Sequence, residues 1–151
     1  MNMIRKFQEA DAQEVSDLIR VTLGKVNKKD YSEEQIKQWR DKYTPDKLKR
    51  LCKKWSFFVA TADNEIVGVG ACYRDHAYSV FVEPEYENKG IGKELMRIIE
   101  KEIIKNGFSK ACADANITAL KFYQKIGYEI DHNYYNEFNM KIYKMSKNLV
   151  L

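Results

Sequence analysis

The sequence is poor in histidine and cysteine and has no long apolar run, and each scarcity excludes a class of protein. His76 and His132 are the only two histidines, which excludes a histidine-rich metal site. The three cysteines, Cys52, Cys72 and Cys112, are odd in number and widely spaced. This spacing argues against a disulfide framework and a zinc site, and it predicts that the protein is located in the reducing cytoplasm. No apolar run approaches the ~20 residues of a membrane helix, so we expect no membrane span.

The first residues also lack the pattern of a signal peptide. Met3 and Ile4 are followed at once by Arg5 and Lys6, with no apolar segment between them and the charges. A chain of 151 residues is most naturally one domain with its own core, and no linker or repeat interrupts it. We therefore expect a single cytoplasmic domain over residues 1–151.

The formal net charge of +4 is modest and is spread along the chain. Basic and acidic residues alternate, and no run of about five or more like charges occurs. This balance suits an anionic cofactor, and we expect no nucleic-acid partner. Nucleic-acid binding through the two densest basic patches remains an alternative. These patches contain Lys25, Lys28, Lys29, Lys47, Lys49, Arg50, Lys53 and Lys54.

Periodicity and capping residues predict strands and helices that together form an α/β fold. Three early helices are expected to begin at Asp11 with Glu14 as capping-box partner, at Ser32 with Gln35, and at Thr44 before Pro45. A long helix ends near Gly107, and a short one ends at Gly127. Strands are expected at 3–7, 57–62, 65–73, 79–82, 109–114, 128–135 and 138–145. This order predicts a mixed, largely antiparallel central sheet that is flanked by helices.

A glycine-containing turn before the long helix is the most informative segment of the chain. The preceding strand stops at Pro84, and residues 87–92 (ENKGIG) lead directly into the helix. A helix N-terminus has unpaired N–H groups and the positive end of the dipole, so it suits phosphate groups. Gly90 and Gly92 would let backbone donors approach a pyrophosphate closely. Alone, such a turn is more often an ordinary strand-to-helix connection, and neither a Walker loop nor a G-x-G-x-x-G string occurs.

The turn and a second segment resemble two motifs of the GNAT superfamily of N-acetyltransferases. The family motif reads roughly [QR]-x-x-G-x-[GA] after a strand that ends in V-x-P, and here Val82-Glu83-Pro84 precedes the turn. Residues 116–128 (NITALKFYQKIGY) resemble the family signature N-x-x-A-x-x-F-Y-x-x-x-G-[FY]. The two motifs and the elements between them cover about residues 57–130. One departure is Glu87, where the family usually has Gln or Arg; Lys89 and Lys93 can offset its charge.

The resemblance implies that acetyl-CoA is the co-substrate and that its acetyl group moves directly to a primary amine. It also implies that the two middle strands of the sheet splay apart and that the pantetheine arm pairs with the backbone of the strand before the turn. Cofactor contacts are therefore expected from Phe81, Val82, Asn88, Lys89, Gly90, Ile91, Gly92, Lys93, Asn116 and Tyr123.

Direct transfer passes through a tetrahedral intermediate and needs an oxyanion donor, an acid and a base. By resemblance, the N–H of Val82 is the oxyanion donor and Tyr123 is the acid that protonates the thiolate, although Tyr123 also fits the buried face of a short helix. Many relatives carry a Glu on the cofactor strand, where this chain has SVFV. Glu83 is our candidate base, with Asp75, His76 and a water relay as alternatives.

The acceptor is expected between the early helices and the final hairpin, and it is a small-molecule or peptide amine. Aromatic side chains there suit an apolar body or a cation, or they are ordinary packing. They are Tyr31, Trp39, Tyr43, Tyr134 and Tyr135. A homodimer is possible. A non-catalytic CoA-binding or regulatory module is the other alternative function.

Overall fold

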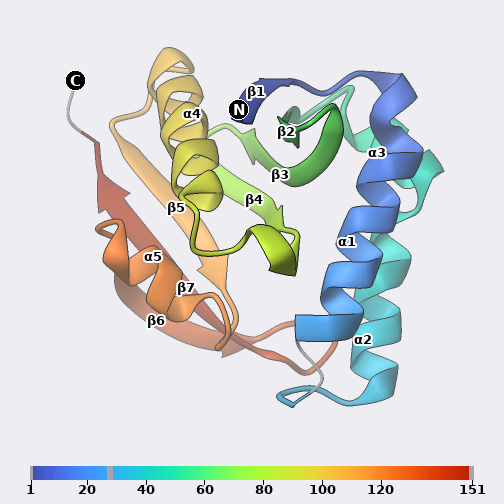
Figure 1. The fold of residues 1–151 in the computed structure, drawn as a ribbon. Coiled ribbons are helices and arrows are strands. Elements are labelled where there is room, and N and C mark those ends of the chain that lie inside the picture. Colours follow the sequence, from blue (N-terminus) through green and yellow to red (C-terminus); the bar gives the residue numbers. More distant parts are fainter. Residues whose placement is uncertain (1, 27–28, 150–151) are drawn as a thin grey trace.

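The computed structural model describes residues 2–26 and 29–149, and it contains one seven-stranded sheet with helices on both faces (Figure 1). The strands are β1 (Asn2–Lys6), β2 (Ser56–Ala62), β3 (Glu65–Tyr73), β4 (His76–Val82), β5 (Lys110–Ala115), β6 (Glu129–Tyr135) and β7 (Lys141–Asn148). The helices are α1 (Ala12–Val26), α2 (Glu33–Arg40), α3 (Pro45–Leu51), α4 (Ile91–Lys105) and α5 (Leu120–Lys125). Short 3-10 turns occupy Glu9–Asp11, Asp41–Tyr43 and Pro84–Tyr86.

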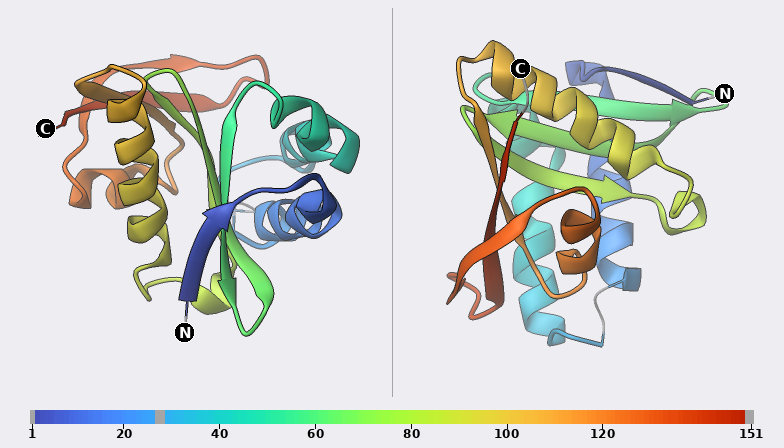
Figure 2. Two further views of the ribbon diagram at one scale, coloured as in Figure 1. Left: turned by 90° about the horizontal axis from the view of Figure 1, so that it is seen from above. Right: turned by 90° about the vertical axis from the view of Figure 1, so that its left-hand side faces the viewer.

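The strand order is β1-β2-β3-β4-β5-β7-β6, and only the β4–β5 pair is parallel. Helices α1, α2 and α3 cover one face, whereas α4 and α5 cover the other (Figure 2). The predicted α/β class with a mixed, largely antiparallel sheet is therefore confirmed. No helix in the described part of the chain is long and apolar enough to span a membrane.

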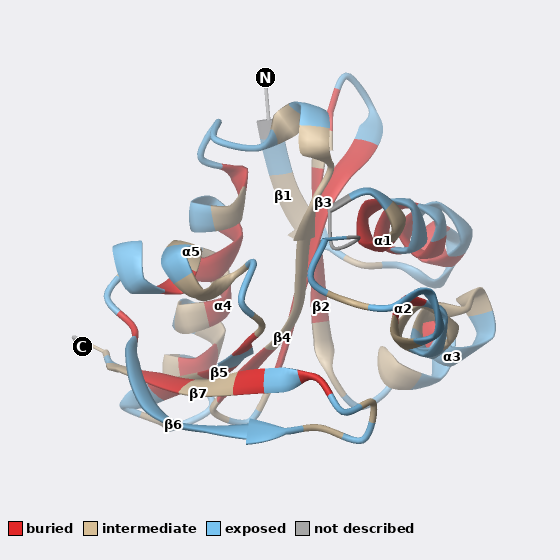
Figure 3. Cartoon of the chain, turned by 90° about the horizontal axis from the view of Figure 1, so that it is seen from below, coloured by how far each residue is buried: buried red, intermediate tan, exposed pale blue. Residues whose placement is uncertain are grey.

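The core lies on both faces of β2 and β3, which are the most buried strands (Figure 3). On one face, Leu95, Ile99 and Ile103 of α4 are fully buried against the sheet. On the other face, Ile19 of α1 packs in a separate apolar cluster. A Cβ on Gly70 of β3 would lie 2.8 Å from Cδ1 of Ile99, so this glycine lets α4 approach the sheet closely.

The start of α1 differs from the prediction. Asp11 accepts the Gln8 N–H at 2.8 Å and forms two hydrogen bonds with Arg5, so it closes a turn before the helix. Glu14 does not complete a capping box; its Oε2 accepts the N–H of Ile66 on β3 at 2.8 Å. Glu14 therefore bonds a strand that is distant in sequence and not the start of its own helix. The predicted caps at Ser32 and Thr44 are confirmed, because each hydroxyl accepts a backbone N–H of its helix.

The last strand begins three residues later than predicted, at Lys141 instead of position 138. The cause is a tight turn that is built on Asn136. Its Oδ1 accepts the N–H groups of Phe138 and Met140, at 2.9 and 3.0 Å. These bonds satisfy backbone donors locally, so residues 136–140 form the hairpin turn and do not join the ladder.

The middle of the sheet opens between β4 and β5. The two strands pair only at His76–Cys112 and Ala77–Ala113 and then diverge. Just beyond this point, the register of β4 against β3 shifts, so that Ser79 and Val80 together lie opposite Gly70. Such a bulge bends a strand and ends its regular pairing. The predicted splay of the middle strands therefore has a local cause in β4.

Candidate active site

Two cavities meet where β4 and β5 diverge. The larger cavity, of about 730 Å³, lies beside α2, α3 and the β6–β7 hairpin. The smaller cavity, of about 400 Å³, lies beside the turn before α4 and beside α5. Six residues line both cavities and so mark their junction: Trp39, Val80, Phe81, Asn116, Ala119 and Tyr123.

The smaller cavity brings together most of the residues that the sequence assigned to the cofactor. They come from the end of β4, from the turn before α4 and from the segment around α5, and they are Phe81, Val82, Asn88, Ile91, Gly92, Asn116 and Tyr123. Lys89 and Gly90 instead face a separate shallow hollow beside Glu94 and Arg97. Lys93 lines neither cavity at the junction.

The turn before α4 presents backbone donors at the edge of the smaller cavity. Gly90 is the N-cap of α4 with φ of +84°, and Asn88 also has a positive φ, of +61°. No side chain caps this end of α4. The first N–H groups of the helix therefore have no side-chain acceptor and can donate hydrogen bonds to an anion.

Charged side chains of both signs surround that anion position. Glu87, the residue that departs from the family motif, lines the smaller cavity. Lys121 and Lys125 of α5 line it too, and sequence reasoning missed both. The two lysines are four residues apart on α5, which places both on the exposed face of the helix, opposite the buried Tyr123. This spacing in the sequence could have identified them as a pair.

The edge of β4 that faces the gap carries free backbone groups near Val82. The N–H of Glu83 donates to the carbonyl of Val67 on β3 at 2.8 Å. Successive N–H groups of an extended strand point to opposite edges. The N–H of Val82 is therefore directed away from β3, toward the gap.

Tyr123 lies at the junction and is only 6% exposed. Its ring packs edge-on against Phe122 and Tyr128. Burial, with a further contribution from the charge of Asp114, raises the pKa of Tyr123 well above its usual value. The phenol is therefore protonated at neutral pH and can act as a proton donor. Asn116, at the same junction, uses its Oδ1 to accept the N–H of Ala119 at 2.8 Å.

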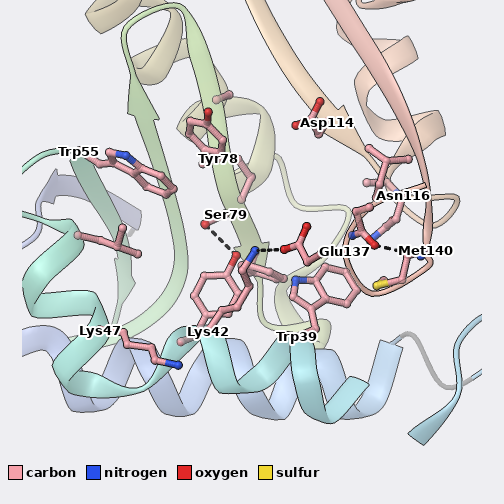
Figure 4. A pocket seen from close by; sticks show the side chains of 18 of the residues that line it. Trp39, Lys42, Lys47, Trp55, Tyr78, Ser79, Asp114, Asn116, Glu137 and Met140 are labelled. Atoms are coloured by element: carbon pink, nitrogen blue, oxygen red, sulfur yellow. Dashed lines mark hydrogen bonds and ion pairs between the residues drawn. The ribbon is translucent and has the colours of Figure 1, made fainter. Parts of the chain in front are cut away.

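The larger cavity has an aromatic wall and charged groups of both signs (Figure 4). Trp39, Tyr43 and Tyr134 line it, as the sequence analysis expected, together with Trp55 and Tyr78. Tyr31 packs edge-on against Trp39 but does not line the cavity, and Tyr135 is 63% exposed outside it. The ion pair between Lys42 Nζ and Glu137 Oε1, at 2.9 Å, joins the 3-10 turn after α2 to the β6–β7 hairpin.

Of the candidate bases, Glu83 and Asp75 line neither cavity. Asp114, which no sequence motif indicates, does line the larger one. Ala113 and Ala115 are buried on the opposite face of β5, so strand alternation was the only signal that placed Asp114 on the cavity side. His76 is nearly buried beneath it, with Nε2 3.3 Å from Asp114 Oδ2.

Asp114 is ionised and its charge is partly compensated. Burial tends to raise its pKa, but the neighbouring His76, Tyr134 and Lys144 outweigh this effect, so the pKa of Asp114 is lower than usual. Lys144 Nζ also lies 3.4 Å from His76 Nδ1, which is the acceptor in this contact because an ammonium group can only donate. His76 Nε2 is buried and has no hydrogen bond of regular geometry among the described residues, although Asp114 Oδ2 is nearby.

The basic patches that suggested a nucleic-acid alternative are divided in the structure. Lys47 and Arg50 line the larger cavity, and Lys54 lies over the ring of Tyr73. Lys28 lies outside the described residues. Part of the basic surface therefore belongs to the cavity wall.

The opened sheet, the uncapped helix end and the buried tyrosine between two cavities together define the class of protein as an acyltransferase. The sequence model described as the acetyltransferase (GNAT) domain matches residues 27–149. The chain therefore belongs to the GNAT family of acetyltransferases, which confirms the resemblance of its two motifs.

Curated relatives and solved structures agree with this assignment. The chain is 27% identical over 126 residues to the uncharacterized N-acetyltransferase YafP of Escherichia coli K12, covering 83% of this chain and 80% of the relative. It is 27% identical over 152 residues to the spermidine N(1)-acetyltransferase of Thermoplasma acidophilum, covering 91% and 94%.

Among solved structures, a GCN5-related N-acetyltransferase from Rhodopseudomonas palustris superposes with a TM-score of 0.92 at 23% identity, over 99% of this chain and 96% of the other. The PaiA N-acetyltransferase of Thermoplasma acidophilum, solved in complex with coenzyme A, gives 0.81 at 25% identity, over 98% and 99%.

Proposed function

We propose that this protein is an acetyl-CoA-dependent N-acetyltransferase that moves an acetyl group directly to a primary amine. The observation that carries the proposal is the junction at Tyr123, where a cavity that starts at an uncapped helix end meets a second, aromatic cavity. A thioester at this junction is accessible to an amine from the other side. The PaiA N-acetyltransferase of similar fold was solved in complex with coenzyme A, which supports coenzyme A as the cofactor.

The cofactor lies along the smaller cavity. Its pyrophosphate accepts the N–H groups at the start of α4, where Gly90 and Gly92 allow close approach. Lys121 and Lys125 compensate the phosphate charge and offset Glu87. The pantetheine arm pairs with the free edge of β4 at Val82, beside the side chain of Phe81, as an added strand would.

The chemistry is attack of a neutral amine on the thioester carbonyl. The N–H of Val82 donates to the developing oxyanion, and the O–H of Tyr123 donates its proton to the departing thiolate. Glu83 remains our predicted general base, which takes the proton that the attacking amine loses. Asp114, as an ionised carboxylate in the larger cavity, attracts the ammonium form of the acceptor, and the amine reacts from its free-base fraction.

The acceptor is a small-molecule or peptide amine with an apolar body that fits among the aromatic side chains of the larger cavity. A second candidate, a CoA-binding module without turnover, is favoured by one observation. The cofactor strand carries SVFV where many relatives have a Glu, and the candidate base Glu83 lines neither cavity.

The test is calorimetric titration of the protein with acetyl-CoA, followed by release of free CoA thiol in the presence of a panel of primary amines. Binding that Gly92→Glu abolishes, with turnover of at least one amine, supports the proposal. Binding without turnover of any amine favours the non-catalytic module. Absence of binding by the unmodified protein contradicts both, and a urea unfolding curve of Gly92→Glu separates a blocked site from an unfolded variant.

A further inference from the structure

Ser79 has a backbone conformation that its position in β4 does not explain. Its φ is +56°, a region that residues with a side chain adopt rarely and at a cost in free energy. The other described non-glycine residues with positive φ lie in turns or loops: Asp63, Asn64, Arg74, Asn88 and Asn139. Ser79 alone among them lies inside a strand, so the surrounding structure holds it in this conformation.

The hydroxyl of Ser79 lies at the larger cavity (Figure 4), which Tyr43 also lines. The distance between Ser79 Oγ and Tyr43 Oη is 3.0 Å. Either hydroxyl can be the donor in this pair, and in both cases Ser79 Oγ keeps at least one lone pair.

The contact with Tyr43 therefore leaves Ser79 Oγ at least one lone pair for another partner. Burial raises the pKa of Tyr43, which keeps the phenol protonated. In the described part of the chain, Ser79 Oγ has no other hydrogen-bond partner. A serine oxygen that is held by the half-buried Tyr43 and is open to a cavity can bind a polar group from that cavity.

The place of Ser79 on β4 indicates which group that is. Val80 and Phe81 line both cavities and mark their junction, and Ser79 is the next residue toward the larger cavity. The β4 bulge, Ser79 and Val80 opposite Gly70, turns this part of the strand toward the gap. Ser79 Oγ therefore lies on the side from which an acceptor approaches a thioester at the junction.

We propose that Ser79 Oγ accepts an N–H of the attacking amine and so aims the nitrogen lone pair at the thioester, with Tyr43 as the positioning residue behind it. This inference rests on the proposed acetyl transfer. It involves no covalent step at Ser79: the serine orients the nucleophile by one hydrogen bond, and the amine loses its proton elsewhere. Orientation of this kind lowers the barrier by fixing the reacting atoms.

A bisubstrate probe tests the proposal without knowledge of the natural acceptor. Alkylation of the CoA thiol with N-butyl bromoacetamide gives an adduct whose amide N–H stands where the attacking nitrogen would be. The dissociation constants of free CoA and of the adduct are measured by calorimetry for the unmodified protein and for Ser79→Ala, Ser79→Gly and Tyr43→Phe. We expect CoA affinity to stay within about two-fold, because no variant touches the smaller cavity's anion site. Adduct affinity should fall roughly 3- to 10-fold, the effect of one lost hydrogen bond.

The two Ser79 variants distinguish the effect of losing the hydroxyl from the effect of backbone strain. Glycine tolerates a positive φ, so Ser79→Gly should melt at or above the temperature of Ser79→Ala while losing the same adduct affinity. Ser56→Ala, which removes a hydroxyl from the start of β2 outside both cavities, is the matched control and should change neither constant.

Equal weakening of CoA and adduct would assign Ser79 a structural role and overturn the proposal. Unchanged adduct affinity in Ser79→Ala would overturn it as well. If the unmodified protein binds neither CoA nor the adduct, the proposed acetyl transfer itself is contradicted. If it binds CoA but the Ser79 variants give one of the two contrary results above, only the role of Ser79 is overturned.

Discussion

Gly92 lies so close to Phe122 that a Cβ atom on the glycine would come within 3.0 Å of Cε1 and 3.2 Å of Cζ of the ring. The start of α4 and the face of α5 therefore touch across the smaller cavity. Gly92 belongs to the first family motif and Phe122 to the second, so the contact joins the two segments that the sequence marked separately. The absence of a side chain at Gly92 therefore serves the packing of α4 against α5, in addition to its proposed role at the phosphate.

Gly92→Ala should therefore destabilise the fold, by about 1–2 kcal/mol, because the new methyl group overpacks against the ring. In a Phe122→Ala background the same substitution should cost close to nothing, since alanine is the better helix residue once the ring is gone. Urea unfolding of the four proteins in this double-mutant cycle measures the coupling. The same loss in both backgrounds would show that the ring is not the cause.

Glu87→Gln should tighten CoA binding about 2- to 10-fold. The substitution removes a negative charge from the smaller cavity, where the phosphates are expected, and restores a residue that the family motif usually carries there. The gain should shrink as salt rises, because the side chain is exposed. Glu85→Gln removes the same charge from a neighbouring exposed position that does not line the cavity, and it should change the affinity much less. Equal gains from both would indicate a general charge effect.

Lys121→Glu and Lys125→Glu should each weaken CoA binding by a few-fold, and the double variant should weaken it further. Both side chains line the smaller cavity from exposed positions on α5, so we expect their attraction to a bound phosphate to be weakened by solvent and salt. The calorimetric dissociation constant at low and high salt is the measurement. Lys105→Glu, at the far end of α4, supplies the same charge change away from the cavity. If it weakens CoA as much as Lys121→Glu does, the effect is not local.

The sequence predicted the elements whose signals are local, and it missed those that depend on tertiary partners. The capping residues Ser32 and Thr44, the amphipathic face of α4 and the succession of elements along the chain are all encoded by neighbours in the chain, and the structure confirms them. Glu14 looked like a capping residue, but its carboxylate binds Ile66 of β3, which is distant in sequence.

The candidate site likewise contains residues that the sequence predicted and residues that it did not. The turn at 87–92 and the segment at 116–128 were found because each is a contiguous motif with a fixed spacing. Asp114, Ser79 and Tyr43 were not assigned together, because only the folded sheet and the register shift in β4 bring them to one cavity. A bulge of one residue leaves no reliable trace in an apolar strand sequence.

Asp11→Asn should destabilise the protein in a pH-dependent way. Hydrogen bonding to Arg5, against an opposing effect of burial, lowers the pKa of Asp11 in the folded state. The unfolded chain therefore takes up the proton first as pH falls, so the stabilisation is complete above the unfolded pKa of about 3.9 and is lost as pH falls through the lower folded value. Urea unfolding should give a loss of about 1–3 kcal/mol at pH 7 that narrows toward pH 3. A loss of the same size at both pH values would exclude the ionised carboxylate as its source.

Tyr123→Phe should lower kcat about 10- to 100-fold for any amine that the protein acetylates, while the dissociation constant of acetyl-CoA stays within about two-fold. The reason is chemical, since phenylalanine keeps the ring contacts with Phe122 and Tyr128 but cannot protonate the thiolate. Because burial raises the pKa of Tyr123, the wild-type phenol stays protonated, and kcat should show no decline between pH 7 and about 9 from its ionisation. Steady-state release of CoA thiol gives both quantities, and Tyr135→Phe, on the exposed edge strand, is the matched control. A variant that retains full kcat would show that the thiolate leaves without this proton and that Tyr123 only fills the junction between the two cavities.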